Sequence, residues 1–242
     1  MYLYYHIGDY DGANWVLNYM WQAYENPARG SAPITWAVNP GLSDRIPMAF
    51  DYFYSNLSPK DTICASDSGV GYMRPQYVFQ DKSLADSRTI ANGGAQYVSY
   101  TKKYFDRFDI DAVSFIIGYM SPQVYAMYNQ IAPVGSFHYD RAKPITIYKG
   151  VPYVPTKNGI GNPGENYNTS AQGMYDYLKT TMKGYNFAAF RTIRWTPAQL
   201  NTLSETFINY AKSKDPSKNY KFVNAYNFMA LVKQSGQATI MN

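Results

Sequence analysis

The chain has 242 residues, of which 46% are hydrophobic, and its formal net charge is +5. This length and apolar content suit a single globular domain, 1–242, and no apolar run approaches the roughly 20 residues that cross a bilayer. Basic residues are scattered, with Lys102-Lys103 the only adjacent pair, so we expect no nucleic-acid partner and no membrane span.

Strand-like and helix-like segments alternate along the chain. Residues 2–7 are rich in β-formers and stop at Gly8, whereas 13–24 place apolar residues at helical spacing. The predicted strands are 2–7, 34–38, 62–65, 112–117, 134–137, a region covering 145–148 and 152–154, 187–190, and a last one starting at 222. The predicted helices are 13–24, one ending near 55, 94–105, 122–130, 172–182, one opening at Thr196-Pro197, and a terminal helix.

This rhythm predicts an α/β fold made of parallel strand–helix units. Seven or eight units without a long linker favour a closed or nearly closed (β/α) barrel of TIM-barrel or distorted-barrel type. The alternative is an open doubly wound sheet. A phosphate-binding glycine loop would support that alternative, but Gly69-Val70-Gly71 lacks the third glycine and opens no helix.

Polar residues follow the predicted strands, which is where parallel β/α folds place their functional groups. These residues are Asp9, Asp11, Asn39, Asp67, Ser68, Tyr72, His138, Glu165, Arg191, Arg194 and Trp195. Asp and Asn also cap helices at such places. However, Asp9 and Asp11 follow a single strand, and two carboxylates exceed what one cap needs.

Aromatic residues make up 17% of the chain, including 26 Tyr and 4 Trp. Tyr and Trp combine a flat apolar face with a hydrogen-bonding group, and sugars need both kinds of contact. The composition therefore agrees with a glycan ligand, although a Tyr-rich core would produce the same count.

One motif with its neighbours resembles a known family. Gly69-Val70-Gly71-Tyr72-Met73-Arg74-Pro75 resembles the signature of the GxGYxYP family, which is described as a family of glycoside hydrolases. Other segments that resemble the C-terminal domain of that family are Gly8-Asp9-Tyr10-Asp11, Arg29-Gly30, Trp36-Ala37, Asn39-Pro40 and Asp67-Ser68-Gly69. The resemblance is strongest over residues 1–80, and Arg74 replaces the tyrosine that precedes the proline of the signature.

The resemblance implies a barrel that acts on carbohydrate, as a stand-alone or excised C-terminal domain, in an extracellular or periplasmic location. Glycoside hydrolysis normally uses one carboxyl group as proton donor and another as nucleophile or base. We expect Asp67 to work with Asp9 or Asp11, and Glu165 to be a reserve acid. The predicted sugar-binding residues are Trp36, Asn39, Ser68, Tyr72, Arg74, His138, Arg194 and Trp195.

Three other interpretations stay open. A metal-dependent polysaccharide deacetylase would need a histidine-rich metal site, and the chain has only His6 and His138. A non-catalytic glycan-binding domain would keep the aromatics without a working carboxylate pair, and a purely structural domain would have no cleft. No organic cofactor is expected, although a Ca²⁺ ion at Asp9 and Asp11 would need only oxygen ligands. Cys64 reads as a buried thiol.

Overall fold

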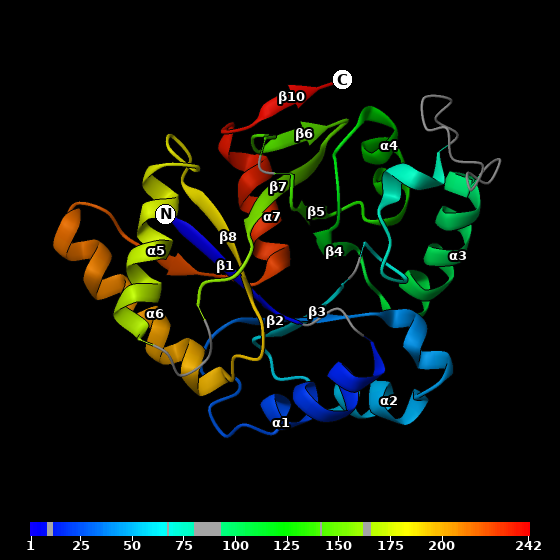
Figure 1. The fold of residues 1–242 in the computed structure, drawn as a ribbon, viewed down its shortest axis with the longest axis horizontal. Coiled ribbons are helices and arrows are strands. Elements are labelled where there is room, and N and C mark those ends of the chain that lie inside the picture. Colours follow the sequence, from blue (N-terminus) through cyan, green and yellow to red (C-terminus); the bar gives the residue numbers. More distant parts are fainter. Residues whose placement is uncertain (9–11, 67, 80–92, 141, 162–165) are drawn as a thin grey trace.

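The computed structural model describes residues 1–8, 12–66, 68–79, 93–140, 142–161 and 166–242 (Figure 1). Its strands are β1 (Tyr2–Ile7), β2 (Ile34–Val38), β3 (Asp61–Ala65), β4 (Ala112–Ile116), β5 (Gly135–His138), β6 (Thr146–Tyr148), β7 (Val151–Lys157), β8 (Phe187–Thr192), β9 (Lys221–Phe222) and β10 (Thr239–Met241). Its α-helices are α1 (Trp21–Tyr24), α2 (Pro47–Ser55), α3 (Gly93–Phe108), α4 (Pro122–Ile131), α5 (Tyr167–Lys179), α6 (Pro197–Lys214) and α7 (Ala225–Ser235). A π-helical turn, Trp15–Met20, precedes α1, and 3-10 turns occupy Pro40–Asp44 and Pro75–Val78.

Seven of the described strands form a closed parallel barrel in the order β1, β2, β3, β4, β5, β7, β8. The pairing of Thr156 with Ala189 and of Lys157 with Phe190 joins β7 to β8, and β8 pairs with β1 along its whole length, from Tyr2–Phe187 to Ile7–Thr192. The α/β barrel predicted from the sequence is therefore confirmed, and the open doubly wound sheet is excluded.

Three short strands lie beside the barrel wall. β6 is antiparallel to β7, and β10 pairs with β6 on its other edge. The region expected to be one strand is thus a hairpin, turned at Lys149-Gly150 with φ values of 45° and 83°, which is the backbone of a tight hairpin turn. β9 pairs with the beginning of β1, while β2 pairs with its end.

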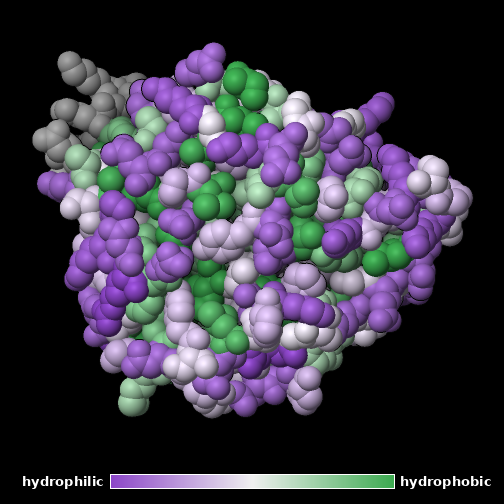
Figure 2. Space-filling view, turned by 180° about the vertical axis from the view of Figure 1, so that it is seen from behind, coloured by the Kyte–Doolittle hydropathy of each residue, from purple (hydrophilic) through white to green (hydrophobic). Residues whose placement is uncertain are grey.

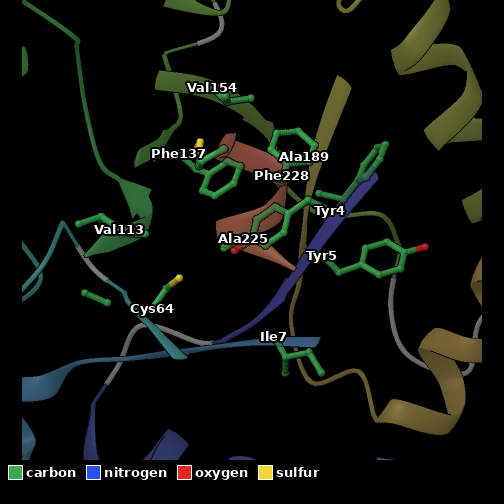
Figure 3. Close-up of a cluster of buried hydrophobic side chains, with 14 of the residues drawn as sticks. Tyr4, Tyr5, Ile7, Cys64, Val113, Phe137, Val154, Ala189, Ala225 and Phe228 are labelled. Atoms are coloured by element: carbon green, nitrogen blue, oxygen red, sulfur yellow. The ribbon is translucent and has the colours of Figure 1, made fainter. Parts of the chain in front are cut away.

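The interior of the barrel at the amino-terminal ends of its strands is filled by α7. Tyr4 of β1 stacks on Phe137 of β5 with ring centroids 4.2 Å apart, and Phe228 of α7 lies 5.7 Å and 5.6 Å from these two rings (Figure 3). Gly135 has no Cβ because one there would come within 2.8 Å of Met229 Sδ. These contacts make α7 a plug of the barrel rather than an outer helix, with Phe228 and Met229 on its buried face and Asn227 on its exposed face.

The other face of each strand packs under the outer helices, because successive side chains of a strand alternate. Tyr5, next to the inward Tyr4, points away from the barrel centre (Figure 3) and stacks on Phe222 at 4.5 Å. On the back of the molecule, hydrophobic residues reach the surface in several separate groups among polar ones (Figure 2). Among the described residues, no helix has both the length and the apolar character needed to cross a membrane.

Candidate functional site

The candidate site lies at the carboxyl ends of the barrel strands, where parallel β/α folds gather their functional groups. The four predicted catalytic acids, Asp9, Asp11, Asp67 and Glu165, lie outside the described residues. The described residues directly beside them in the chain are Gly8 before Asp9, Gly12 after Asp11, Ser66 and Ser68 on either side of Asp67, and Asn166 after Glu165.

Ser68 anchors the loop that carries the glycine signature. Its hydroxyl donates to the Met73 carbonyl over 2.8 Å and accepts from the backbone N–H of Ile117 over 2.9 Å. The Ser68 carbonyl also accepts the hydroxyls of Tyr97 and Tyr128. Ser68 is fully buried, so its hydroxyl and its carbonyl both have protein partners in this loop.

The signature glycine Gly69 is needed for two reasons. Its φ of 120° is one that residues with side chains rarely adopt, and a Cβ there would come within 2.6 Å of the Tyr97 hydroxyl. The turn then presents Tyr72, whose side chain is 68% exposed, and Arg74, which is exposed and begins the next 3-10 turn. The signature thus places an aromatic ring and a guanidinium at this edge.

An open pocket of about 460 Å³ lies beside the signature turn. It is lined by Arg74, Gln76, Ile117, Gly118, Tyr119, Tyr139, Asp140 and Asn158. These residues follow β3, β4, β5 and β7. Tyr119 stands at the pocket with 74% of its side chain exposed, whereas Asp140 is only 9% exposed. The wall therefore combines an accessible aromatic ring with hydrogen-bonding groups of both kinds.

A buried arginine supports the wall of this pocket. Arg191 of β8 is 7% exposed, and its Nη1 atom donates to the Tyr139 hydroxyl over 2.8 Å and to Asn158 Oδ1 over 3.0 Å. Its guanidinium carbon lies 5.3 Å from the centre of the Phe115 ring, which provides a favourable cation–π contact. Arg191 therefore ties the ends of β5, β7 and β8 together.

The two histidines lie on opposite sides of the barrel wall. His6 follows the inward Tyr4 by two residues and points inward, while His138 follows the inward Phe137 by one and points outward. Burial lowers the pKa of His6 to about 3, helped by the nearby Arg191 charge, and burial lowers that of His138 to about 4. Among the described residues, neither nitrogen of the His6 ring has a hydrogen-bond partner. With pKa values this low, both histidine rings are neutral at pH 7.

Both tryptophans that the sequence predicts to bind sugar are fully buried. Trp36 lies under the outer helices with its ring centroid 5.1 Å from that of Tyr24. Trp195 donates from Nε1 to the Gly161 carbonyl over 3.3 Å and lies 6.0 Å from the Tyr167 ring. Neither ring presents a face at the pocket described above.

Asn39 and Arg194 also have partners within the protein. The Asn39 side chain caps the 3-10 turn that follows β2, because its Oδ1 accepts the Gly41 N–H over 3.0 Å. Arg194 has a φ of 60° and lies over the Tyr19 ring at 4.4 Å from its centroid. The structure thus brings Arg74 to the pocket, and it places Asn39 and Arg194 in other contacts at the same end of the barrel.

Of the residues that line the pocket, only Arg74 was predicted from the sequence; sequence reasoning missed Gln76, Ile117, Gly118, Tyr119, Tyr139, Asp140 and Asn158. Tyr139 and Asp140 directly follow β5, so the rule that singled out His138 would have reached them two residues later. Asn158 follows β7, which extends to Lys157 and not only to residue 154 as predicted. Among the described residues, no cluster of three or more His, Cys, Asp or Glu side chains is arranged to hold a metal ion.

Nearly the whole chain matches one known protein family. Residues 1–233 match the model described as "GxGYxYP putative glycoside hydrolase C-terminal domain". The chain belongs to the GxGYxYP family. The match confirms the predicted resemblance and extends it well beyond residue 80. No curated protein is significantly similar to this chain in sequence.

Two solved structures align with nearly the whole length of this GxGYxYP domain. One is described as a "putative hydrolase" from Bacteroides thetaiotaomicron and has a TM-score of 0.70 at 17% identity, covering 96% of this chain and 45% of that chain. This chain thus spans less than half the length of that hydrolase, and the likeness shows the fold alone. A 4-alpha-glucanotransferase from Thermococcus litoralis has a TM-score of 0.47 at 10% identity over 95% of this chain and 38% of that chain, which is too low to support an argument.

Proposed function

We propose that this domain is a glycoside hydrolase that cleaves a glycosidic bond at the carboxyl edge of the barrel. The observation that carries the proposal is the open pocket at that edge, with Arg74 of the family signature in its wall. A concave site with a few converging polar groups is the usual form of a ligand site. Membership of a family described as glycoside hydrolases makes carbohydrate the ligand that we propose.

We assign the chemistry to Asp67 together with Asp9 or Asp11, with Glu165 as a reserve acid. One carboxylic acid would protonate the departing glycosidic oxygen, and the second carboxylate would attack the anomeric carbon or activate a water molecule. Support comes from Gly8, Ser66 and Ser68, the described chain neighbours of these acids, which follow β1 and β3 at the carboxyl edge.

The test is Asp67→Asn, assayed by the release of reducing ends from a panel of plant and bacterial polysaccharides. We expect the rate to fall by about 10²–10⁴-fold, as for the loss of a general acid or base. Asp51→Asn on the exposed side of α2 is the matched control and should leave the rate unchanged. Undiminished hydrolysis by Asp67→Asn would remove Asp67 from the proposal.

A glycan-binding domain without hydrolysis is the second candidate, and the exposed rings of Tyr72 and Tyr119 favour it. The two candidates differ in one measurement, since a binding domain would retain a polysaccharide on an affinity gel without releasing reducing ends. The deacetylase alternative receives less support, because the alternation of side chains along β1 and β5 places His6 and His138 on opposite sides of the barrel wall. Release of acetate from an acetylated glycan would support the deacetylase alternative.

Two further expectations stay predictions. The Ca²⁺ site at Asp9 and Asp11 lies outside the described residues, and its test is whether added Ca²⁺ raises the melting temperature. The extracellular or periplasmic location, implied by the family resemblance, is tested by fractionating the cells that produce the protein.

A further inference from the structure

Three side chains, two of which line the pocket, form a closed hydrogen-bonded ring in its wall. Arg191 Nη1 donates to the Tyr139 hydroxyl and to Asn158 Oδ1, over 2.8 Å and 3.0 Å. The Tyr139 hydroxyl in turn donates to Asn158 Oδ1 over 2.7 Å. The Asn158 oxygen therefore accepts two hydrogen bonds, and both come from residues inside the barrel wall.

This ring fixes the orientation of the Asn158 amide. Arginine has only N–H donors, so the group that faces Arg191 must be the amide oxygen and not the amide nitrogen. The Nδ2 atom, with its two N–H groups, must then face the other way. Asn158 is exposed and lines the pocket, and no hydrogen bond among the described residues engages its Nδ2 atom. Arg191 thus makes Asn158 a donor toward the pocket.

Asp140 supplies acceptors in the same pocket. Its Oδ2 accepts the Met120 N–H over 3.1 Å and its Oδ1 accepts the Ala142 N–H over 3.2 Å. These bonds hold the side chain in place and leave lone pairs on both oxygens, because a carboxylate accepts about four hydrogen bonds. Among the described residues that line the pocket, Asp140 and Arg74 are the charged ones and their charges are opposite.

The geometry points to a subsite for one neutral pyranose unit of a glycan, in which Asn158 donates to one ring hydroxyl and Asp140 accepts from another. Each sugar hydroxyl can donate and accept, so a fixed donor and a fixed acceptor suit two hydroxyls on one ring. Tyr119 offers its exposed ring to the apolar face of the sugar. Arg191 is a positioning residue that acts through Asn158. The assignment rests on the proposed function for the class of ligand.

The decisive variant is Asn158→Asp, because it keeps the shape of the side chain and removes the donors. A carboxylate at this position can still accept from Arg191 and Tyr139, so the melting temperature should be unchanged or raised. The probes are cellotetraose, maltotetraose, mannotetraose, xylotetraose and β-1,4-galactotetraose, titrated into ¹⁵N-labelled protein. At least one should shift the amide signals of Gly118, Tyr119 and Asn158. Asn158→Asp should weaken its binding at least tenfold.

Asn227→Asp, on the exposed side of α7, is the matched control and should bind as the unmodified chain does. Arg191→Lys tests the positioning role. It should weaken binding in the unmodified chain but have no further effect in Asn158→Asp, because a residue that acts through Asn158 loses its target there. An additive effect of the two substitutions would overturn this role.

The subsite is rejected if Asn158→Asp binds as tightly as the unmodified chain, or if none of the five sugars shifts those amide signals. Reducing ends are measured in the same samples. Binding that depends on Asn158 without any cleavage would contradict the hydrolase and keep the subsite. Cleavage at the same rate in Asn158→Asp and in the unmodified chain would contradict the subsite and support the hydrolase.

Discussion

The two ends of the barrel interior differ in character: the amino end is aromatic, and the carboxyl end is polar. At the amino end, Tyr4 and Phe137 stack on each other and pack against Phe228 of α7. At the carboxyl end, Arg191 and Tyr139 carry hydrogen bonds out to an exposed Asn158. The aromatic end gains stability from apolar burial, whereas the polar end keeps hydrogen-bonding capacity available for a ligand. Substitutions at the aromatic end should therefore mainly change stability, and substitutions at the polar end should mainly change ligand binding.

The largest effect should come from the aromatic end. Phe228→Ala would leave a cavity between Tyr4, Phe137 and Phe187, and we expect the free energy of unfolding to fall by about 3–5 kcal/mol. Urea denaturation measures this loss. Leu17→Ala, at a side chain that is 53% exposed, is the control and should cost less than about 0.5 kcal/mol. Equal effects of the two variants would contradict the role of α7 as a plug.

A smaller effect should appear between the two ends, where His6 lies. Burial lowers its pKa in the folded state to about 3, below the value of about 6.5 that it has when unfolded. The unfolded chain therefore binds the proton first as the pH falls, and His6 costs stability below pH 6.5. From pH 6.5 to 4.5 we expect about 2 kcal/mol of loss from this residue.

His6→Leu should remove that part of the pH dependence and cost little at pH 7, because neither ring nitrogen has a hydrogen-bond partner in the described part of the chain. Urea denaturation of both proteins at pH 6.5, 5.5 and 4.5 gives the comparison. Parallel pH profiles would show that His6 is protonated in the folded chain, contrary to its burial.

The smallest effect on stability should come from the polar end. Tyr119→Ala removes a ring that is 74% exposed, so the free energy of unfolding should change by less than about 0.5 kcal/mol. Binding of the tetrasaccharide that the chain recognises should weaken about fivefold, which corresponds to about 1 kcal/mol. Titration of the variant beside the unmodified chain checks this, and unchanged binding would mean that the ring does not touch the sugar.

The sequence predicts the barrel well because its strands end at clear punctuation, such as Gly8 after β1 and Asn39-Pro40 after β2. It does not predict where α7 lies. The buried residues Ala225, Phe228, Met229 and Val232 have the spacing of any amphipathic helix. Nothing local distinguishes a helix on the outer surface from one inside the barrel, because that choice depends on partners such as Tyr4 and Gly135.

The candidate site was predictable in position but only partly in content. The rule that polar residues follow strands identified His138 and would have reached Asp140 two residues later. Asn158 depends on the length of β7, and strand ends are difficult to predict from sequence. Trp36 was expected at the ligand, and it is fully buried under α1. A large aromatic residue serves a core and a sugar site equally well, so its type alone does not reveal which face of the strand it occupies.

The position of α7 also constrains when the barrel can become complete. β1 begins at Tyr2, and the helix that fills the space behind it begins at Ala225. On the ribosome, the strands are made long before the residues that cover their inner aromatic rings. The early segments therefore keep their apolar surface exposed until α7 has been synthesised. Contacts between such distant parts of a chain slow folding, so this domain should depend on chaperones during synthesis more than a barrel closed by local contacts.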